Sequence, residues 1–137
     1  MIHIATDASY RPQTQEAGLG IVLSYQGQRQ EVKAYLTQVA DNHVAEFMAV
    51  HQAFLAIGRL AWPKDIIMLQ SDSQVVVESL NKGYVKNPLY QPYLQAILGE
   101  VTHPDTFFVK WVSDRDNLGA DHLARKAVAQ EAPVLYL

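Results

Sequence analysis

The order in which strand-like and helix-like segments follow one another is the feature that most constrains the fold of this chain. Three strand patterns come first, a long helical pattern follows, and strands then alternate with helices. The expected elements are strands at residues 2–6, 17–25 and 29–36, a helix at 44–60, a strand at 66–69, helices at 74–81 and from Pro88 to about Gly99, a strand at 106–112 and a helix at 117–130. A hairpin followed by βα units predicts an α/β fold, with a mixed sheet and helices packed on it.

Local features indicate the surroundings of some of these elements. Gly18 and Gly20 lie inside the second strand, where a backbone or a ligand is expected to approach closely. Ser73 is a suitable N-cap for the helix that follows it. The continuous apolar run at 66–69 is typical of a strand buried on both faces. Aromatic side chains are expected in the core at Trp62, Phe107 and Trp111.

Size and composition narrow the class of protein. With 137 residues, of which 49% are hydrophobic and 18% charged, the chain is expected to form one globular domain, residues 1–137. The absence of cysteine excludes disulfides and thiolate metal sites, and agrees with a cytoplasmic location. No signal peptide or membrane-spanning run is present, so we expect no membrane association. The net charge of −3 argues against tight, non-specific binding to nucleic acid.

Four acidic residues fall where the predicted elements approach one edge of the sheet. Asp7 follows the first strand and Asp72 follows the strand that begins near Ile66, so both carboxylates leave the sheet at one end if these strands are parallel neighbours. Glu46 opens the apolar stripe of the long helix and therefore faces the sheet. Asp121 has apolar residues three and seven positions after it, which turns it inward as well. The pattern predicts that the four carboxylates converge.

A cluster of carboxylate oxygens is typical of a site for hard divalent cations. We therefore expect Mg²⁺, with Mn²⁺ as an alternative, and two ions once a substrate with phosphate groups is bound. Each acid taken alone has an ordinary interpretation, as a strand-end or helix-start residue. The sequence contains no Gly-rich phosphate loop, no thiol nucleophile and no Gly-x-Ser-x-Gly motif, so we expect no organic cofactor.

Five short motifs follow one another along nearly the whole chain. They are Thr6-Asp7-Ala8-Ser9, Ala17-Gly18-Leu19-Gly20, Asn42-His43-Val44-Ala45-Glu46-Phe47-Met48-Ala49, Ser71-Asp72-Ser73-Gln74-Val75-Val76, and the set Asn117, Ala120, Asp121, Leu123, Ala124 and Ala127. In this order and at this spacing the motifs resemble the ribonuclease H family.

The resemblance implies a ribonuclease H-like fold, a five-stranded mixed sheet with helices on both faces. It also implies magnesium-dependent endonucleolytic cleavage of the RNA strand of RNA–DNA hybrids. The implied catalytic and metal-binding acids are Asp7, Glu46, Asp72 and Asp121. The implied substrate contacts are Asn42, Gln74, Ser9, Arg115 and Asn117. The ordinary interpretation of Asn42 is a helix cap, and that of Gln74 is an early helical position.

Two departures from the family pattern lower the expected activity. Many members carry a flexible loop with a histidine before the last helix, whereas residues 113–117 form a short connection without one. Arg115 resembles the arginine that a shorter-loop branch of the family has there. The basic protrusion that some members use to hold the hybrid is reduced to Lys82 and Lys86. We therefore expect weak hybrid affinity and modest turnover.

The remaining candidate residues receive ordinary interpretations. The histidines at 3, 43, 51 and 103 show no ligand spacing and are expected to be structural or surface residues. Asp114 and Asp116 are expected to be exposed loop acids, with metal binding as the alternative.

Three functions compete at this point. A hybrid-specific ribonuclease is the leading hypothesis, because the acid set is complete. A weakly active or inactive relative that binds nucleic acid or a protein is the first alternative, since the histidine loop is missing and the net charge is negative. A proofreading-type exonuclease is the second, but such enzymes place Asp and Glu two positions apart on the first strand, whereas Asp7 is followed by Ser9.

Overall fold

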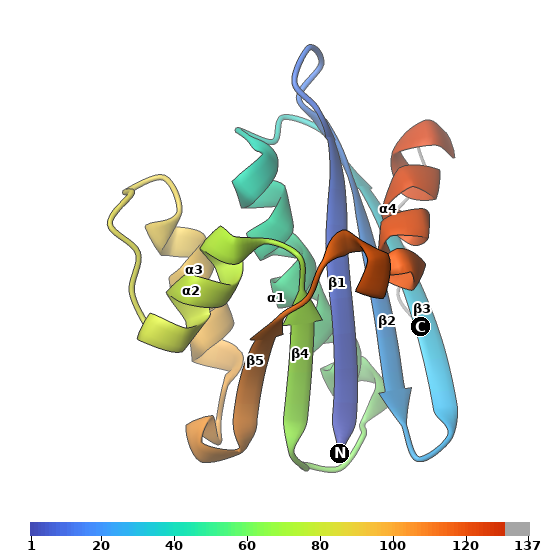
Figure 1. Ribbon diagram of the computed structural model, residues 1–137, viewed down its shortest axis with the longest axis vertical. Helices are drawn as coiled ribbons and strands as arrows, with labels where there is room; N and C mark the ends of the chain where they lie inside the picture. The colour runs from blue at the N-terminus through green and yellow to red at the C-terminus, as the bar shows by residue number, and fades with distance from the viewer. Residues whose placement is uncertain (131–137) are drawn as a thin grey trace.

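The computed structural model describes residues 1–130, and these form a single twisted sheet with helices on both sides (Figure 1). The strands are β1 (Ile2–Arg11), β2 (Glu16–Tyr25), β3 (Gln28–Leu36), β4 (Ile67–Ser71) and β5 (Phe107–Trp111). Their order in the sheet is β3-β2-β1-β4-β5. The pairs β1–β2 and β2–β3 are antiparallel, and β1–β4 and β4–β5 are parallel. The five-stranded mixed sheet is therefore confirmed.

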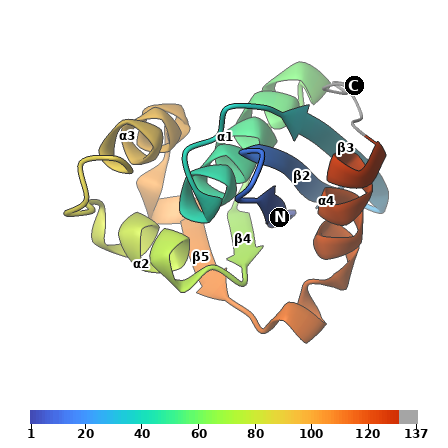
Figure 2. The same cartoon turned by 90° about the horizontal axis from the view of Figure 1, so that it is seen from above.

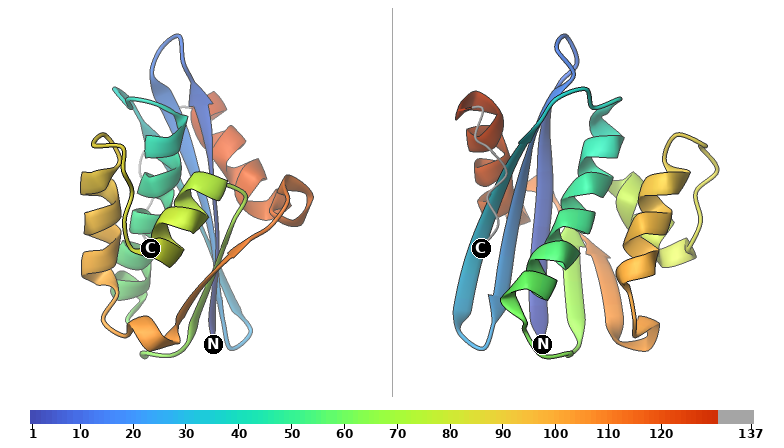
Figure 3. Two further views of the ribbon diagram at one scale, coloured as in Figure 1. Left: turned by 60° about the vertical axis from the view of Figure 1, so that its left-hand side comes forward. Right: turned by 180° about the vertical axis from the view of Figure 1, so that it is seen from behind.

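The helices divide unequally between the two faces of the sheet. They are α1 (Asn42–Leu60), α2 (Gln74–Lys82), α3 (Gln91–Glu100) and α4 (Leu118–Gln130), with short 3₁₀ turns η1 (Pro104–Thr106) and η2 (Asp114–Asp116). Helix α1 crosses one face over β1 and β2, and α2 and α3 pack beside it (Figures 2 and 3). Helix α4 covers the other face over β1, β2 and β3. As expected, Ser73 caps α2, where its hydroxyl accepts the Val76 N–H.

Strand β1 is longer than its apolar pattern predicts. It continues past Thr6 to Arg11, because β2 pairs with it over that whole length. Its parallel neighbour β4 stops earlier, and the last pair between them is Thr6 with Ser71. Asp7 therefore does not end its own strand. It lies at the point where β1 loses its parallel partner, which places it at the expected edge of the β1–β4 pair.

The close backbone approach expected at the glycines of β2 comes from α4. A Cβ atom built on Gly18 would lie 2.1 Å from the Ala124 carbonyl oxygen, and one on Gly20 would lie 2.0 Å from that of Ala120. No side chain fits at such distances, so helix and strand can touch only because both positions are glycine. The register pairs Gly20 with Asp7. This contact therefore brings the first turn of α4 close to Asp7.

Two expectations about burial are wrong. Helix α4 covers β1 to β3 and leaves the same side of β4 and β5 largely open. The apolar run that begins at Ile66 is thus not buried on both faces: Ile66 is 37% exposed and Met68 is half-buried. Trp111 is 45% exposed and lies outside the core, while Trp62 and Phe107 are half-buried and pack against it.

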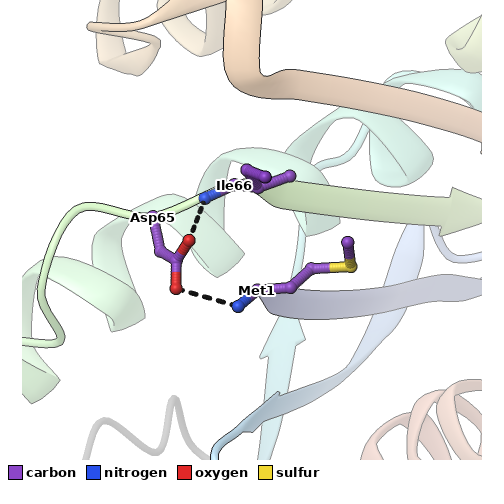
Figure 4. Close-up of polar contacts among 3 residues, drawn as sticks. All are labelled: Met1, Asp65 and Ile66. Atoms are coloured by element: carbon purple, nitrogen blue, oxygen red, sulfur yellow. Dashed lines mark hydrogen bonds and ion pairs between the residues drawn. The ribbon is translucent and has the colours of Figure 1, made fainter.

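The opposite end of the β1–β4 pair is held by a polar contact. The carboxylate of Asp65 accepts one hydrogen bond from the Met1 ammonium group, at 2.8 Å, and another from the Ile66 backbone N–H, at 2.7 Å (Figure 4). These bonds join the start of β1 to the start of β4. Among residues 1–130, no helix combines the length and apolar character needed to cross a membrane.

Candidate active site

A cleft opens where β1 and β4 part and where four helical segments begin. Its volume is about 630 Å³, and it is lined by the first turns of α1, α2 and α4, by η2 and by the middle of β1. The lining side chains include all four predicted acids: Asp7, Glu46, Asp72 and Asp121. The sequence elements that carry them are far apart in the chain, and the sheet topology brings them together.

Three of the acids form a tight group. One carboxylate oxygen from each of Asp7, Glu46 and Asp72 lies within 4.8 Å of the others. Asp7 and Glu46 are buried, at 4% and 6% exposure. Asp72 is half-buried at the end of β4, where its backbone carbonyl accepts the indole N–H of Trp111 at 3.0 Å. The prediction that Glu46 faces the sheet and not the solvent is confirmed.

Burial and mutual repulsion disfavour the charged forms of these acids. Burial, followed by the charges of Asp7 and Asp72, raises the pKa of Glu46 to about 9. Burial and then the charge of Asp72 raise the pKa of Asp7 to about 8. Burial also raises the pKa of Asp72. Without a cation, this group of acids holds protons that free carboxylic acids would release.

The fourth acid has different surroundings. Asp121 is half-buried on the first turn of α4, and it does not belong to the 4.8 Å group. Its Oδ1 accepts a hydrogen bond from the Arg125 guanidinium at 3.2 Å, one helical turn further on. It is nevertheless close enough to Asp7 that its carboxyl group contributes to the raised pKa of Asp7. The fourth acid thus borders the other three.

The donor set fits a hard divalent cation. The three close groups offer only carboxylate oxygens, the ligands preferred by Mg²⁺ and Mn²⁺. Glu46 Oε2 is buried and has no hydrogen-bond partner among the described residues. A buried carboxylate oxygen in that position is costly unless a cation or a proton meets it. The arrangement is therefore suited to a metal ion held by Asp7, Glu46 and Asp72.

The predicted substrate contacts fall into two groups. Asn42, Gln74 and Arg115 are exposed and line the cleft. Ser9 is half-buried on β1 opposite Gly18 and is absent from the lining.

Asn117 has a structural position and not a place on the cleft surface. It is 1% exposed, its Nδ2 donates to the Thr6 carbonyl at 2.8 Å, and its Oδ1 accepts from Gln70 at 3.2 Å. These bonds tie β1 and β4 to the start of α4, and they leave Asn117 without surface for a substrate. The expected cap role of Asn42 is also wrong, because Asp41 precedes the helix and accepts the Val44 N–H.

Two further residues, which sequence alone does not mark as functional, also line the cleft. His43 lines the cleft, and its Nδ1 is buried without a hydrogen-bond partner among the described residues. Asp114 lines the cleft as well, and its charge contributes to the raised pKa of Asp72. The position of His43 beside Asn42 was the available signal. Asp116, in contrast, accepts a bond from Ser113 and does not line this cleft.

Comparison with known proteins agrees with this geometry. The sequence model of the RNase H family matches residues 1–129 of this chain. The chain belongs to the ribonuclease H family. The match covers the elements that build the cleft, so the fold, the position of the acids and the family assignment support one another.

Relatives of this ribonuclease H family member include proteins known from sequence and from structure. It is 32% identical over 133 residues to the protein named "Putative hydrolase EbsB" from Enterococcus faecalis, covering 97% of this chain and 98% of that one. It is similar to RNase H1 from the halophilic archaeon Halobacterium salinarum NRC-1, with a TM-score of 0.81 and 27% identity over 96% of this chain and 98% of that one. LC11-RNase H1, solved in complex with an RNA/DNA hybrid, has a TM-score of 0.85 at 23% identity, over 96% and 99% of the two chains. Family membership supports a nuclease of the hydrolase class.

Proposed function

We propose that this protein hydrolyses the RNA strand of RNA–DNA hybrids by metal-dependent endonucleolytic cleavage. The observation that carries the proposal is the group of buried, mutually repelling carboxylates at Asp7, Glu46 and Asp72, bordered by Asp121 in one cleft. Such a group is unstable by itself and is stabilised by divalent cations. Membership of the ribonuclease H family and the hybrid-bound structure of LC11-RNase H1 support the choice of substrate.

In this proposal the acids bind the metal and the polar side chains around the cleft bind the substrate. Bound Mg²⁺ or Mn²⁺, as two ions once the substrate is present, would supply an activated water and stabilise the leaving oxygen. Asp7, Glu46 and Asp72 would hold the metal, with Asp121 at the border of the site. All three acids also line the cleft, so a metal ion held by them would be accessible to a substrate.

Exposed polar side chains around the acids would orient the nucleic acid. Asn42 and Gln74 offer amide groups at the first turns of α1 and α2, where helix N-termini also favour phosphate. Arg115 offers a guanidinium group from η2. We propose these three as contacts to the sugar–phosphate backbone. Ser9 stays a weaker candidate, because it lies outside the cleft lining.

A cleavage assay tests the proposal. The protein is incubated with an RNA–DNA hybrid whose RNA strand is labelled at one end, and with duplex DNA and duplex RNA of the same sequence, in Mg²⁺ and in Mn²⁺. We expect internal cuts in the RNA of the hybrid alone, and loss of activity in Asp72→Asn and in EDTA. No cleavage in either metal would overturn the proposal, and stepwise digestion from a free 3′ end would favour an exonuclease.

A binding module of the same family is the second candidate. The short connection at 113–117, which has no histidine, and the net charge of −3 favour it. It predicts that Asp7→Asn leaves the cellular function unchanged, whereas a nuclease loses its function in that variant. Complementation by the wild-type and Asp7→Asn proteins in cells that lack the gene separates the two.

A further inference from the structure

Tyr90 links two helices at the rim of the cleft. It precedes α3, is 8% exposed, and its hydroxyl donates a 2.6 Å hydrogen bond to Asp41 Oδ2. The other oxygen of the same carboxylate accepts the Val44 N–H at 2.8 Å and so caps α1. One carboxylate therefore joins the beginning of α3 to the beginning of α1.

The ring of Tyr90 adds a second link to the same turn. It packs edge-on against His43, with ring centroids 5.7 Å apart and planes at 77°. It also lies against Phe47, at 5.6 Å and 38°. The first turn of α1 is thus held from outside the helix by a hydroxyl at its cap and by a ring beneath His43.

This turn carries side chains that face the cleft. Asn42 and His43 both line it, and Glu46 follows one turn later. Helix ends fray because their first N–H groups have no partner within the helix, so the orientation of a first turn depends on external contacts. Burial and the bond to Asp41 raise the pKa of Tyr90 to about 12, so its hydroxyl remains a donor at neutral pH. A hydrogen bond to a carboxylate is about twice as strong as one between neutral groups.

We propose that Tyr90 is a positioning residue, which through Asp41 and His43 holds the first turn of α1 in the orientation that hybrid binding requires. This inference rests on the proposed function, since it concerns the substrate of the same cleft. Capping alone does not require Tyr90, because the Asp41 carboxylate caps α1 with its other oxygen. The Tyr90–Asp41 hydrogen bond and the ring contacts therefore restrict the orientation of the turn as well as stabilise its formation.

The experiment compares Tyr90→Phe with Tyr93→Phe. The first variant keeps the ring and removes the bond to Asp41. The second removes a hydroxyl on the same helix that has no hydrogen bond among those found in residues 1–130, and it serves as the matched control. Amide hydrogen exchange is followed at Val44 and, as an internal reference, at Ala53 in the middle of α1. Hybrid binding is measured by fluorescence anisotropy in an Asp72→Asn background, so that the hybrid is not consumed.

Positioning predicts two changes in Tyr90→Phe alone. Exchange at Val44 should quicken about ten-fold relative to Ala53, because the cap loses its external support. The hybrid Kd should rise about three- to ten-fold, whereas it should stay within two-fold in Tyr93→Phe. A third variant, Asp41→Ser, keeps a good N-cap, but its side chain is too short to reach Tyr90. Its exchange rate at Val44 should match that of Tyr90→Phe, and the double variant should show no further increase.

Each contrary result has its own meaning. Equal acceleration at Val44 and Ala53 would show general destabilisation and overturn the positioning role. Faster exchange at Val44 with an unchanged hybrid Kd would overturn the link to substrate. If the protein with an intact Tyr90 binds no hybrid and the wild type cleaves none, the proposed function fails, and the exchange data still decide whether Tyr90 holds the turn.

Discussion

Two helices bring acids to the cleft from opposite faces of the sheet, and these two acids differ in burial and in their hydrogen-bond partners. Glu46 on α1 is 6% exposed, and its Oε2 has no partner among the described residues. Asp121 on α4 is half-buried and bonded to Arg125. The cleft thus combines an acid that needs a cation from solution with an acid that has one within its own helix.

The difference follows from how each helix is held. Helix α1 lies over apolar residues of β1 and β2, so a side chain on its inner stripe is desolvated whether or not it is charged. Helix α4 touches the strand backbone at Gly18 and Gly20, which leaves its neighbouring first-turn residues at the rim. Burial therefore raises the pKa of Glu46, whose charged form lacks a partner within the protein, whereas the half-buried Asp121 is already paired with Arg125. Four changes test this contrast.

The largest effect is expected from neutralising the two acids. Glu46→Gln should lower hybrid cleavage by at least about 10³-fold, because it removes a ligand from the buried group. Asp121→Asn should cost less, on the order of 10–100-fold, because Asp121 lies outside that group. Cleavage rates under saturating Mg²⁺ measure both. Equal losses would show that the two acids are equivalent, and would break the comparison.

The next effect concerns the backbone contact that positions α4. Gly20→Ala would place a Cβ 2.0 Å from the Ala120 carbonyl, so helix and strand must separate. We expect a loss of roughly 2–4 kcal/mol in the free energy of unfolding. Urea denaturation measures it.

A glycine on the other helix is the control for that change. Gly58 lies in α1, and a Cβ there meets nothing within 4 Å. Gly58→Ala should stabilise the protein by about 0.5–1 kcal/mol, because alanine is the better helix former. A Gly20→Ala variant as stable as the wild type would show that α4 is not held by this contact.

The sequence alone predicts where the acids lie, because each of them follows a periodic pattern or stands at the end of an element. Glu46 lies on an apolar stripe with a fixed step, and Asp72 follows a strand. His43 has neither kind of signal, and only its position beside Asn42 pointed to the cleft. Its place in the cleft depends on Tyr90, which packs against it from another helix, and no periodicity within α1 encodes that contact.

The sequence also did not indicate which strands of the sheet α4 covers. An apolar run at 66–69 has the same composition whether one face or both are covered, and α4 covers only β1 to β3. The burial of Asn117 follows from its position just before that helix, where its side chain bonds to the Thr6 carbonyl. Trp111 is exposed because it is the last residue of the edge strand β5. Such facts depend on tertiary packing and not on local pattern.

The third effect is on the pH dependence of stability without metal. The pKa of Glu46 is about 9 in the folded protein, above the 4.5 of a free side chain. Between these values the folded state holds a proton that the unfolded state releases, so the free energy of unfolding should fall as pH rises from about 5 to 9. Asp7, with a pKa of about 8, adds to the same trend.

Denaturation in EDTA at pH 5.5 and pH 8 measures this effect. Glu46→Gln should flatten the dependence and be more stable than the wild type by about 1–2 kcal/mol at pH 8. Asp121→Asn should change it less, and Mg²⁺ should restore wild-type stability at pH 8. A wild-type protein that gains stability with rising pH in EDTA would contradict the assignment of Glu46 as the metal-dependent acid.

The smallest effect is expected at the ion pair of α4. Arg125 is 74% exposed and four residues after Asp121, the arrangement of an ordinary surface pair on a helix. Arg125→Gln should cost only about 0.3–0.5 kcal/mol in the free energy of unfolding, and less in 0.5 M NaCl than at low salt. A double-mutant cycle with Asp121→Asn isolates the pair. The same cycle is measured for Glu46 and Asp7. If the coupling energy of the Asp121–Arg125 pair were the larger in magnitude, Asp121 would have the stronger electrostatic interaction, which is the reverse of what the burial of the two acids indicates.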